Sequence, residues 1–207
     1  MSDLPSTIRA FTAISVSQDI VDNITARLES LRAALADLNI RWVPVANYHI
    51  TLCFIGDIPS VEADNIMPVV AKVSEEFNPF TLKVGHLRLF PSPETGAVLV
   101  ADVTRDEPLM TLQAKLNHAL LDAGYDIPQR DKYRPHMTLA RLRKNRVSPD
   151  LLEQPGECLI NPVSKVHLYR SWKIKDESDG KKKVVKNEII RSHAFSQGEL
   201  KITPLWP

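Results

Sequence analysis

Hydrophobic residues recur along the chain with two different spacings. Three stretches carry them three and four residues apart, which is the spacing of one helix face, and this predicts amphipathic helices at residues 18–39, 60–77 and 106–123. Other stretches alternate apolar and polar residues or form short apolar runs, which predicts strands at residues 8–16, 49–55, 80–90, 97–103, 136–142, 163–174 and 184–193. The last two strands flank a charged turn around Gly180 and predict a long hairpin, while residues 147–155 are expected to be a connector.

The predicted elements repeat in order. A strand, a helix and a second strand occur near the start of the chain and again from residue 97 onward. Each repeat ends in a similar tetrapeptide, His-Ile-Thr-Leu at residues 49–52 and His-Met-Thr-Leu at residues 136–139, with 87 residues between the two histidines. This long interval predicts a duplicated supersecondary unit and not a short-period solenoid.

Each tetrapeptide presents one histidine and one threonine on the same side of its strand. Side chains alternate between the two faces of a strand, so His49 and Thr51 point one way, as do His136 and Thr138. The hydrophobic residues between them point into the interior. We therefore expect one active site that is assembled from two half-sites, with these four residues as its catalytic groups.

Two imidazoles and two hydroxyls suit an in-line displacement at phosphorus. The entering and leaving oxygens lie on opposite sides of the phosphorus, so one group accepts a proton on one side while another donates a proton on the far side. The unperturbed pKa of histidine, about 6.5, allows both protonation states near neutral pH. Threonine hydroxyls and a nearby guanidinium can hold the non-bridging oxygens, where negative charge builds up.

Length and composition restrict the class of protein further. The chain has 207 residues, only two cysteines, no apolar run long enough to cross a membrane and no charged segment followed by an apolar one at its start. We therefore expect a soluble cytoplasmic protein, in which Cys53 is a buried and inert thiol. No His or Cys spacing resembles a zinc site, and no glycine-rich phosphate loop is present, so we expect neither a metal nor a cofactor.

Basic residues gather around the second tetrapeptide. Residues 130–146 include seven Lys or Arg side chains against Asp131 as the single acidic one, although the net charge of the whole chain is only +1. A local basic cluster of this kind indicates phosphate contacts, so we expect nucleic acid as a partner. The remaining four histidines belong to no repeated pattern.

Four segments together resemble a known family. They are Arg-Ala-Phe-Thr-Ala-Ile at residues 9–14, His-Ile-Thr-Leu-Cys-Phe-Ile-Gly at residues 49–56, Arg-Pro-His-Met-Thr-Leu-Ala-Arg at residues 134–141, and Leu168-Tyr169-x-Ser171. They resemble the two-histidine (2H) phosphoesterase superfamily, and within it the RNA 2′,3′-cyclic phosphodiesterases that were formerly called 2′–5′ RNA ligases. The resemblance covers most of the chain. It implies an α+β fold in which residues 1–207 form a single domain of two intertwined lobes, a bilobal pseudo-twofold duplication of two antiparallel sheets flanked by helices, with one motif per lobe lining a central cleft.

The resemblance also implies roles for individual residues. His49 matches the histidine that is taken as proton donor, His136 matches the proton acceptor, and Arg141 matches an arginine five residues after the second histidine. On an ideal strand, Arg141 would point away from the cleft unless a bulge changes its direction. Arg134 is a further candidate for phosphate contact, with plain surface charge as the alternative.

Two positions depart from the family pattern. Thr12 stands where some members carry an aromatic residue, which leaves Phe11 or Trp42 as candidates to stack on a base. Family members often have a tyrosine after the glycine of the last hairpin, but here Gly180 is followed by three lysines at residues 181–183. The contact made by that tyrosine is therefore not expected.

The expected function is metal-independent hydrolysis of a terminal 2′,3′-cyclic phosphate to a 2′-phosphomonoester. The expected partner is RNA with such an end, or a cyclic nucleotide, and the protein is expected to be a monomer. One alternative within the same class is a 2′–5′ RNA ligase or 2′–5′ phosphodiesterase. Another alternative, from a different class, is a non-catalytic protein that binds RNA ends.

Overall fold

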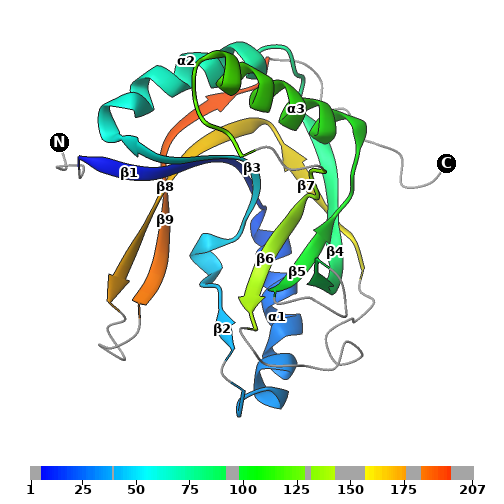
Figure 1. Ribbon diagram of the computed structural model, residues 1–207. Helices are drawn as coiled ribbons and strands as arrows, with labels where there is room; N and C mark the ends of the chain where they lie inside the picture. The colour runs from blue at the N-terminus through cyan, green and yellow to red at the C-terminus, as the bar shows by residue number, and fades with distance from the viewer. Residues whose placement is uncertain are drawn as a thin grey trace.

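The computed structural model describes residues 6–38, 40–91, 98–128, 132–142, 157–175 and 183–196 (Figure 1). Its three helices are α1 (Gln18–Ala34), α2 (Ala63–Ser74) and α3 (Glu107–Asp122), and two short 3₁₀ turns are η1 (Val45–Asn47) and η2 (Ser60–Glu62). Its strands are β1 (Thr7–Ser15), β2 (Arg41–Trp42), β3 (His49–Pro59), β4 (Phe80–Phe90), β5 (Val98–Val103), β6 (His136–Arg141), β7 (Leu159–Val163), β8 (Lys165–Lys175) and β9 (Lys183–Ala194).

The nine strands form one curled antiparallel sheet. The hydrogen-bonded order is β7-β4-β5-β6-β3-β1-β8-β9, and β2 pairs with β6 beside this path. The expected α+β class and the antiparallel pairing are confirmed. The two sheets that were expected are connected, because the pair Ile50 and Met137 joins β3 to β6 at the middle of the order.

Helices cover one face of this sheet. Helix α1 packs beneath the half that contains β4 and β7, where Arg27 donates a hydrogen bond of 2.8 Å to the carbonyl of Gly85. Helices α2 and α3 pack against each other and against β3, β8 and β9 (Figure 1). Cys53 is buried beneath α3, and burial raises the pKa of its thiol to about 12, so the thiol stays protonated.

The helices agree with the predicted ones except at their ends. The stretch predicted from residue 60 begins as the 3₁₀ turn η2 and continues as α2, which passes through Pro68 without interruption. Pro68 is exposed, so the carbonyl that it leaves without an intrahelical donor can bind water. Gly124 has a positive φ of 89° and ends α3, because glycine adopts this conformation without steric cost.

The sequence pattern did not predict two of the strands, β7 and β2. β7 contains Pro162 and reads as a breaker, but it lies at the edge of the sheet and pairs only with β4, where the missing N–H costs no ladder bond. β2 has just two residues, too few for a pattern. The predicted hairpin is formed by β8 and β9, whereas its turn around Gly180 and the connector at residues 147–155 lie outside the described residues. None of the helices in the described ranges is long and apolar enough to cross a membrane.

Candidate active site

The two tetrapeptides meet at the centre of the sheet. Ile50 lies directly opposite Met137 in the antiparallel pair β3 and β6, and both side chains are fully buried on the helix face. Continued by one residue in each direction, this register would bring His49 toward Thr138 and Thr51 toward His136, and the charge of His136 does act on the ring of His49. Directly opposed residues share a face, so all four side chains lie on the other face of the sheet, which we call the open face. The structure thus brings together the four predicted residues in a twofold arrangement.

A bulge in β6 determines where Arg141 points. Thr138 pairs with Val100 but Ala140 pairs with Leu99, so Leu139 is an extra residue in β6. Leu139 and Ala140 are consecutive buried residues, and the strand changes phase after them. Arg141 therefore returns to the open face beside Thr138, although the plain alternation of a strand would send it to the helix face.

The same bulge occurs in β3. Thr51 pairs with Ala13 and Cys53 pairs with Thr12, which makes Leu52 the extra residue. From the histidine onward, the six residues of each motif strand have the same sequence of half-buried, buried and exposed positions. Phe54 is thereby the counterpart of Arg141, five residues after its histidine, and the residue is 46% exposed. Sequence reasoning did not single out Phe54, because its direction depends on the bulge.

Both imidazoles are held by the backbone in the same way. His49 Nδ1 lies 2.7 Å from the carbonyl oxygen of Asn47, and His136 Nδ1 lies 2.7 Å from the carbonyl oxygen of Arg134. A carbonyl oxygen can only accept a hydrogen bond, so each Nδ1 carries a proton. The nitrogen left for chemistry is Nε2, which accepts a proton in the neutral ring and donates one in the charged ring.

His49 sits among aromatic side chains. Its ring centroid lies 4.9 Å from that of Phe11 and 5.4 Å from that of Tyr169, and the Phe11 and Tyr169 rings stack at 5.1 Å. Burial in these surroundings lowers the pKa of His49 to about 4, and the nearby charge of His136 lowers it further, whereas the bond to Asn47 opposes the change. His49 is therefore neutral at pH 7 in the protein without a ligand.

His136 has a different environment. The ring of Phe90 stacks on it at 4.5 Å, and Asp102 of β5 lies directly opposite it on the open face. Asp102 also forms an ion pair with Arg88. Phe90 and Asp102 are contacts that the sequence did not predict, because they depend on the pairing of β4, β5 and β6. The two histidines are thus related in backbone position but not in surroundings.

The other predicted contacts fall in different places. Arg134 is exposed and its guanidinium donates to the carbonyl of Pro91 at 3.3 Å, while its own carbonyl holds His136. Phe11 is only 3% exposed, so its ring supports His49 and is not accessible to a base. Trp42 pairs with buried Ala140 on the helix face and packs under Arg32, whose guanidinium carbon lies 5.2 Å from the ring centre. Neither Phe11 nor Trp42 is placed to stack on a base at the candidate site, so both predictions are wrong.

Asn47 connects the first motif to the hairpin. Its side chain is 7% exposed; its Nδ2 donates to the carbonyl of Val185 at 2.6 Å, and its Oδ1 accepts from the backbone N–H of Asn187 at 3.0 Å. The same residue holds the ring of His49 through its own carbonyl. The position of His49 therefore depends on how β9 and η1 are joined.

Replacing Asn47 by alanine is expected to lower the free energy of unfolding by about 1–3 kcal/mol, because two backbone groups of β9 lose their partners. Chemical denaturation measures this change. Asn187→Ala is the matched control, since Asn187 uses its backbone N–H in this contact and should be nearly neutral. Equal stability of Asn47→Ala and the parent protein would contradict the role assigned to the side chain.

No group of three or more His, Cys, Asp or Glu side chains is arranged to hold a metal ion among the residues that the structure describes.

Comparisons with known proteins identify the family of the chain. Residues 14–100 match the model of the LigT like Phosphoesterase family. A protein from Methanothermobacter thermautotrophicus named RNA 2′,3′-cyclic phosphodiesterase is 31% identical over 170 residues, which cover 79% of this chain and 90% of the relative. A protein of the same name from Bacillus subtilis is 33% identical over 101 residues, 49% of this chain and 55% of the relative.

Solved structures show the same fold. The crystal structure of E. coli LigT complexed with 3′-AMP superposes with a TM-score of 0.72 at 20% sequence identity, over 92% of this chain and 99% of LigT. The α+β fold is thus shared along nearly the whole length of both chains, and the archaeal relative matches in sequence over most of its own length. The chain belongs to the RNA 2′,3′-cyclic phosphodiesterase family of LigT-like phosphoesterases.

Proposed function

We propose that the protein hydrolyses terminal 2′,3′-cyclic phosphates of RNA to 2′-phosphomonoesters, with His49 and His136 as the proton-transfer groups. The observation that carries this proposal is the twofold arrangement of the two histidines about the pair Ile50 and Met137. Each Nδ1 is bound to a backbone carbonyl, which leaves each Nε2 for chemistry. The name shared by the relatives points to the same reaction.

The proposed reaction is a single in-line displacement. His136 Nε2 accepts a proton from water while the water oxygen forms a bond to phosphorus. The bond between phosphorus and the ribose 3′-oxygen breaks, and His49 Nε2 donates its proton to that oxygen. The product keeps its phosphate on the 2′-oxygen, and the net change is the addition of one water molecule.

Thr51 and Thr138 are the proposed phosphate-holding groups. Each lies two residues after its own histidine on the same face of the strand, next to the pair Ile50 and Met137 that joins the two motifs. Hydroxyl donors at this position stabilise the negative charge that builds up on the non-bridging oxygens. Arg141, which the bulge returns to the open face, supplies a guanidinium beside Thr138 for the same purpose.

The donor role of His49 requires help from the substrate. In the free protein its pKa is about 4, so the ring is neutral at pH 7. A bound phosphodiester places a negative charge beside the ring, and a nearby opposite charge favours the protonated imidazole. Substrate binding is therefore expected to raise the pKa of His49 and so favour the protonated ring that donates to the leaving oxygen.

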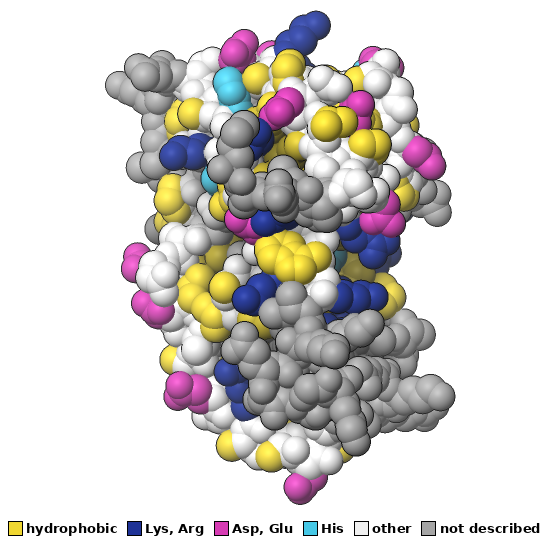
Figure 2. All heavy atoms as spheres, turned by 90° about the vertical axis from the view of Figure 1, so that its left-hand side faces the viewer, with side chains coloured by type: hydrophobic (Ala, Val, Ile, Leu, Met, Phe, Trp, Pro, Cys, Tyr) yellow, Lys and Arg dark blue, Asp and Glu magenta, His cyan; other side chains and the backbone are white. Residues whose placement is uncertain are grey.

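RNA as the substrate class is supported by the surface. Figure 2 shows a hydrophobic patch bordered by Lys and Arg side chains on the side of the molecule where the β8–β9 hairpin lies. Apolar and cationic groups together suit single-stranded nucleic acid, and the exposed side chain of Arg134 adds a further cation next to His136. All the residues of the proposed site belong to one chain, so we propose that the protein is a monomer. We also propose that it acts in the cytoplasm.

The proposed function predicts hydrolysis of nucleoside 2′,3′-cyclic monophosphates in the presence of EDTA, because the two imidazoles supply both proton transfers. The assay separates the 2′- and 3′-phosphate products by chromatography, and only the 2′-phosphate is expected. Loss of activity in EDTA that a divalent ion restores would contradict the metal-independent mechanism. A 3′-phosphate product would contradict the leaving group, and binding without turnover would favour an RNA-end-binding protein.

A further inference from the structure

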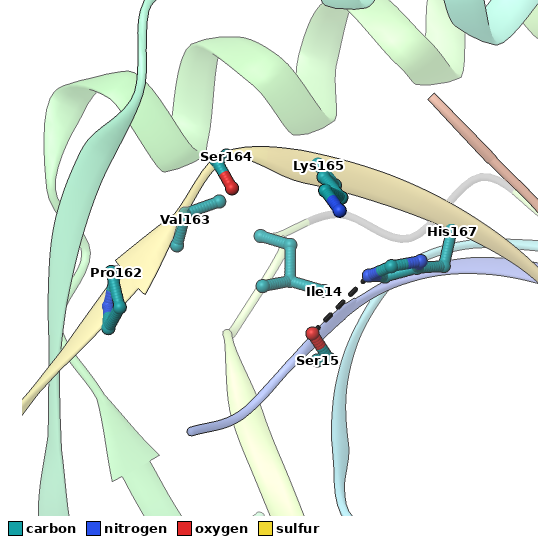
Figure 3. Close-up of a pocket in the computed structure, with 7 residues that line it drawn as sticks. All are labelled: Ile14, Ser15, Pro162, Val163, Ser164, Lys165 and His167. Atoms are coloured by element: carbon teal, nitrogen blue, oxygen red, sulfur yellow. Dashed lines mark hydrogen bonds between the residues drawn. The ribbon is translucent and has the colours of Figure 1, made fainter. Parts of the chain in front are cut away.

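A pocket lies at the end of β1, where β7 passes into β8. Its volume is about 240 Å³, and its polar lining consists of Ser15, Ser164, Lys165 and His167, while Ile14 and Val163 contribute apolar walls. Figure 3 shows the side chains of Ser164, Lys165 and His167 directed toward the same space as that of Ser15. The pocket is smaller than the ~300–1,000 Å³ usual for sites that enclose whole small molecules. Its size suits a compact group such as a phosphate.

The pocket is adjacent to the proposed active site. Ser15 of β1 lies directly opposite His49 of β3, and His167 of β8 lies opposite Ala13 of β1. Opposed residues in an antiparallel pair share a face and have Cα atoms about 4.5–5.5 Å apart. A ligand in the pocket would therefore lie one strand away from His49, on the open face.

The polar groups are held in a fixed arrangement. His167 is 9% exposed; its Nε2 lies 3.3 Å from the hydroxyl of Ser15 (Figure 3) and its Nδ1 lies 2.7 Å from the hydroxyl of Ser192. Asn161, fully buried, donates from Nδ2 to the carbonyl of Ser15 at 3.2 Å and so holds the end of β1 against β7. Ser15 is exposed, and its hydroxyl is positioned by the contact with the buried ring of His167.

The charge of the pocket is positive. Lys165 is exposed at its rim, and none of the lining residues is acidic. Within the described part of the chain, no ion pair engages its amino group. Burial lowers the pKa of His167, and the nearby positive charge of Lys165 lowers it further. The hydroxyls of Ser15 and Ser164 and the ammonium group of Lys165 form a set of donors that suits an anion, and His167 positions the first of them.

We propose that this pocket binds the 5′-phosphate of the terminal nucleotide, while its 2′,3′-cyclic phosphate occupies the active site. This inference rests on the proposed function. A nucleotide that ends in a 2′,3′-cyclic phosphate carries only one other phosphate, and that phosphate is attached to the 5′-oxygen. A second anion site one strand away from His49 can therefore distinguish the end of an RNA chain from a free nucleoside 2′,3′-cyclic phosphate, which lacks the 5′-phosphate.

A binding experiment tests the pocket without turnover. Calorimetry compares adenosine 2′-phosphate with adenosine 2′,5′-bisphosphate, which differ only in the 5′-phosphate. The 5′-phosphate is expected to tighten binding about tenfold in the parent protein, as one charge-assisted contact would, and the gain should shrink as salt is raised. Lys165→Ala should remove the gain and leave the affinity for adenosine 2′-phosphate unchanged.

Two control variants test whether the gain in affinity depends on the pocket or only on the net charge of the protein. Lys165→Arg keeps a cation at the rim and should retain most of the gain. Lys72→Ala removes an exposed lysine from α2 on the helix face and should leave the gain intact. Equal binding of the two nucleotides to the parent protein, or a gain that survives in Lys165→Ala, would overturn the assignment. A third outcome would indicate a site for free phosphate instead. In that case inorganic phosphate binds in a Lys165-dependent way, but the bisphosphate shows no gain over adenosine 2′-phosphate.

A kinetic experiment separates failure of the pocket from failure of the proposed function. The substrates are adenosine 2′,3′-cyclic phosphate with and without a 5′-phosphate. Hydrolysis of both with equal kcat/KM would support the function and refute the pocket. Absence of hydrolysis together with the Lys165-dependent gain in binding would refute the function and retain the anion site.

Discussion

Replacing His49 or His136 by alanine is expected to lower kcat/KM on the order of 10²–10⁴-fold, which is the usual contribution of a positioned proton-transfer group. The two variants should respond differently to the leaving group. An aryl phosphodiester, whose leaving oxygen has a low pKa, needs no proton from His49, so it should partly restore activity in His49→Ala. The same substrate should not rescue His136→Ala, since the attacking water would still lack its base. Steady-state kinetics with both substrates measures this difference.

His118→Ala provides the control for loss of an imidazole, because His118 is an exposed residue of α3 that pairs with Asp122 on the same helix. Its kinetics should match those of the parent protein. Rescue of His136→Ala instead of His49→Ala would reverse the two roles. Full activity in either variant would remove that histidine from the mechanism.

The imidazole of His49 is expected to titrate near pH 4 in the free protein and at higher pH when adenosine 2′-phosphate is bound. Burial is the main cause of the low pKa, and the negative charge of the ligand favours the protonated ring. Histidine ring signals followed by NMR across pH measure both values, with His49→Gln to assign the signal. An unchanged pKa in the complex would contradict the proposal that the substrate loads the proton donor.

The same low pKa links His49 to the pH dependence of stability. Between the ordinary histidine pKa of 6.5 and about 4, the unfolded chain takes up a proton that the folded chain does not. Stability should therefore fall as the pH falls through this window. His49→Gln lacks this contribution, so its free energy of unfolding should fall less between pH 7 and pH 4.5.

The sequence predicted that the two motif strands meet and which residues of each share a face, because these signals are local. Alternation in a strand is enough to place His49 with Thr51 and His136 with Thr138, and the repeated tetrapeptide is enough to suggest that they meet. The helix ending at Gly124 and strands β1 and β4 also follow from short-range patterns. These elements agree with the structure to within a residue or two.

Other features depend on strand pairing and could not be derived from one sequence. The direction of Arg141 is set by the extra residue Leu139, which exists only relative to β5. Asp102 meets His136, and Asn47 meets β9, through contacts between segments far apart in the chain. His167 belongs to no repeated motif, and its place beside Ser15 appears only when β1 and β8 are aligned.

The junction between β3 and β6 also has a mechanical consequence. Only the pair Ile50 and Met137 is matched between these strands, whereas β1 and β3 are matched along their whole length. The sheet therefore has a seam at its centre, and the two imidazoles lie on opposite sides of it. A small rotation of one half about this seam would change the distance between the two Nε2 atoms while the strand pairing within each half is kept.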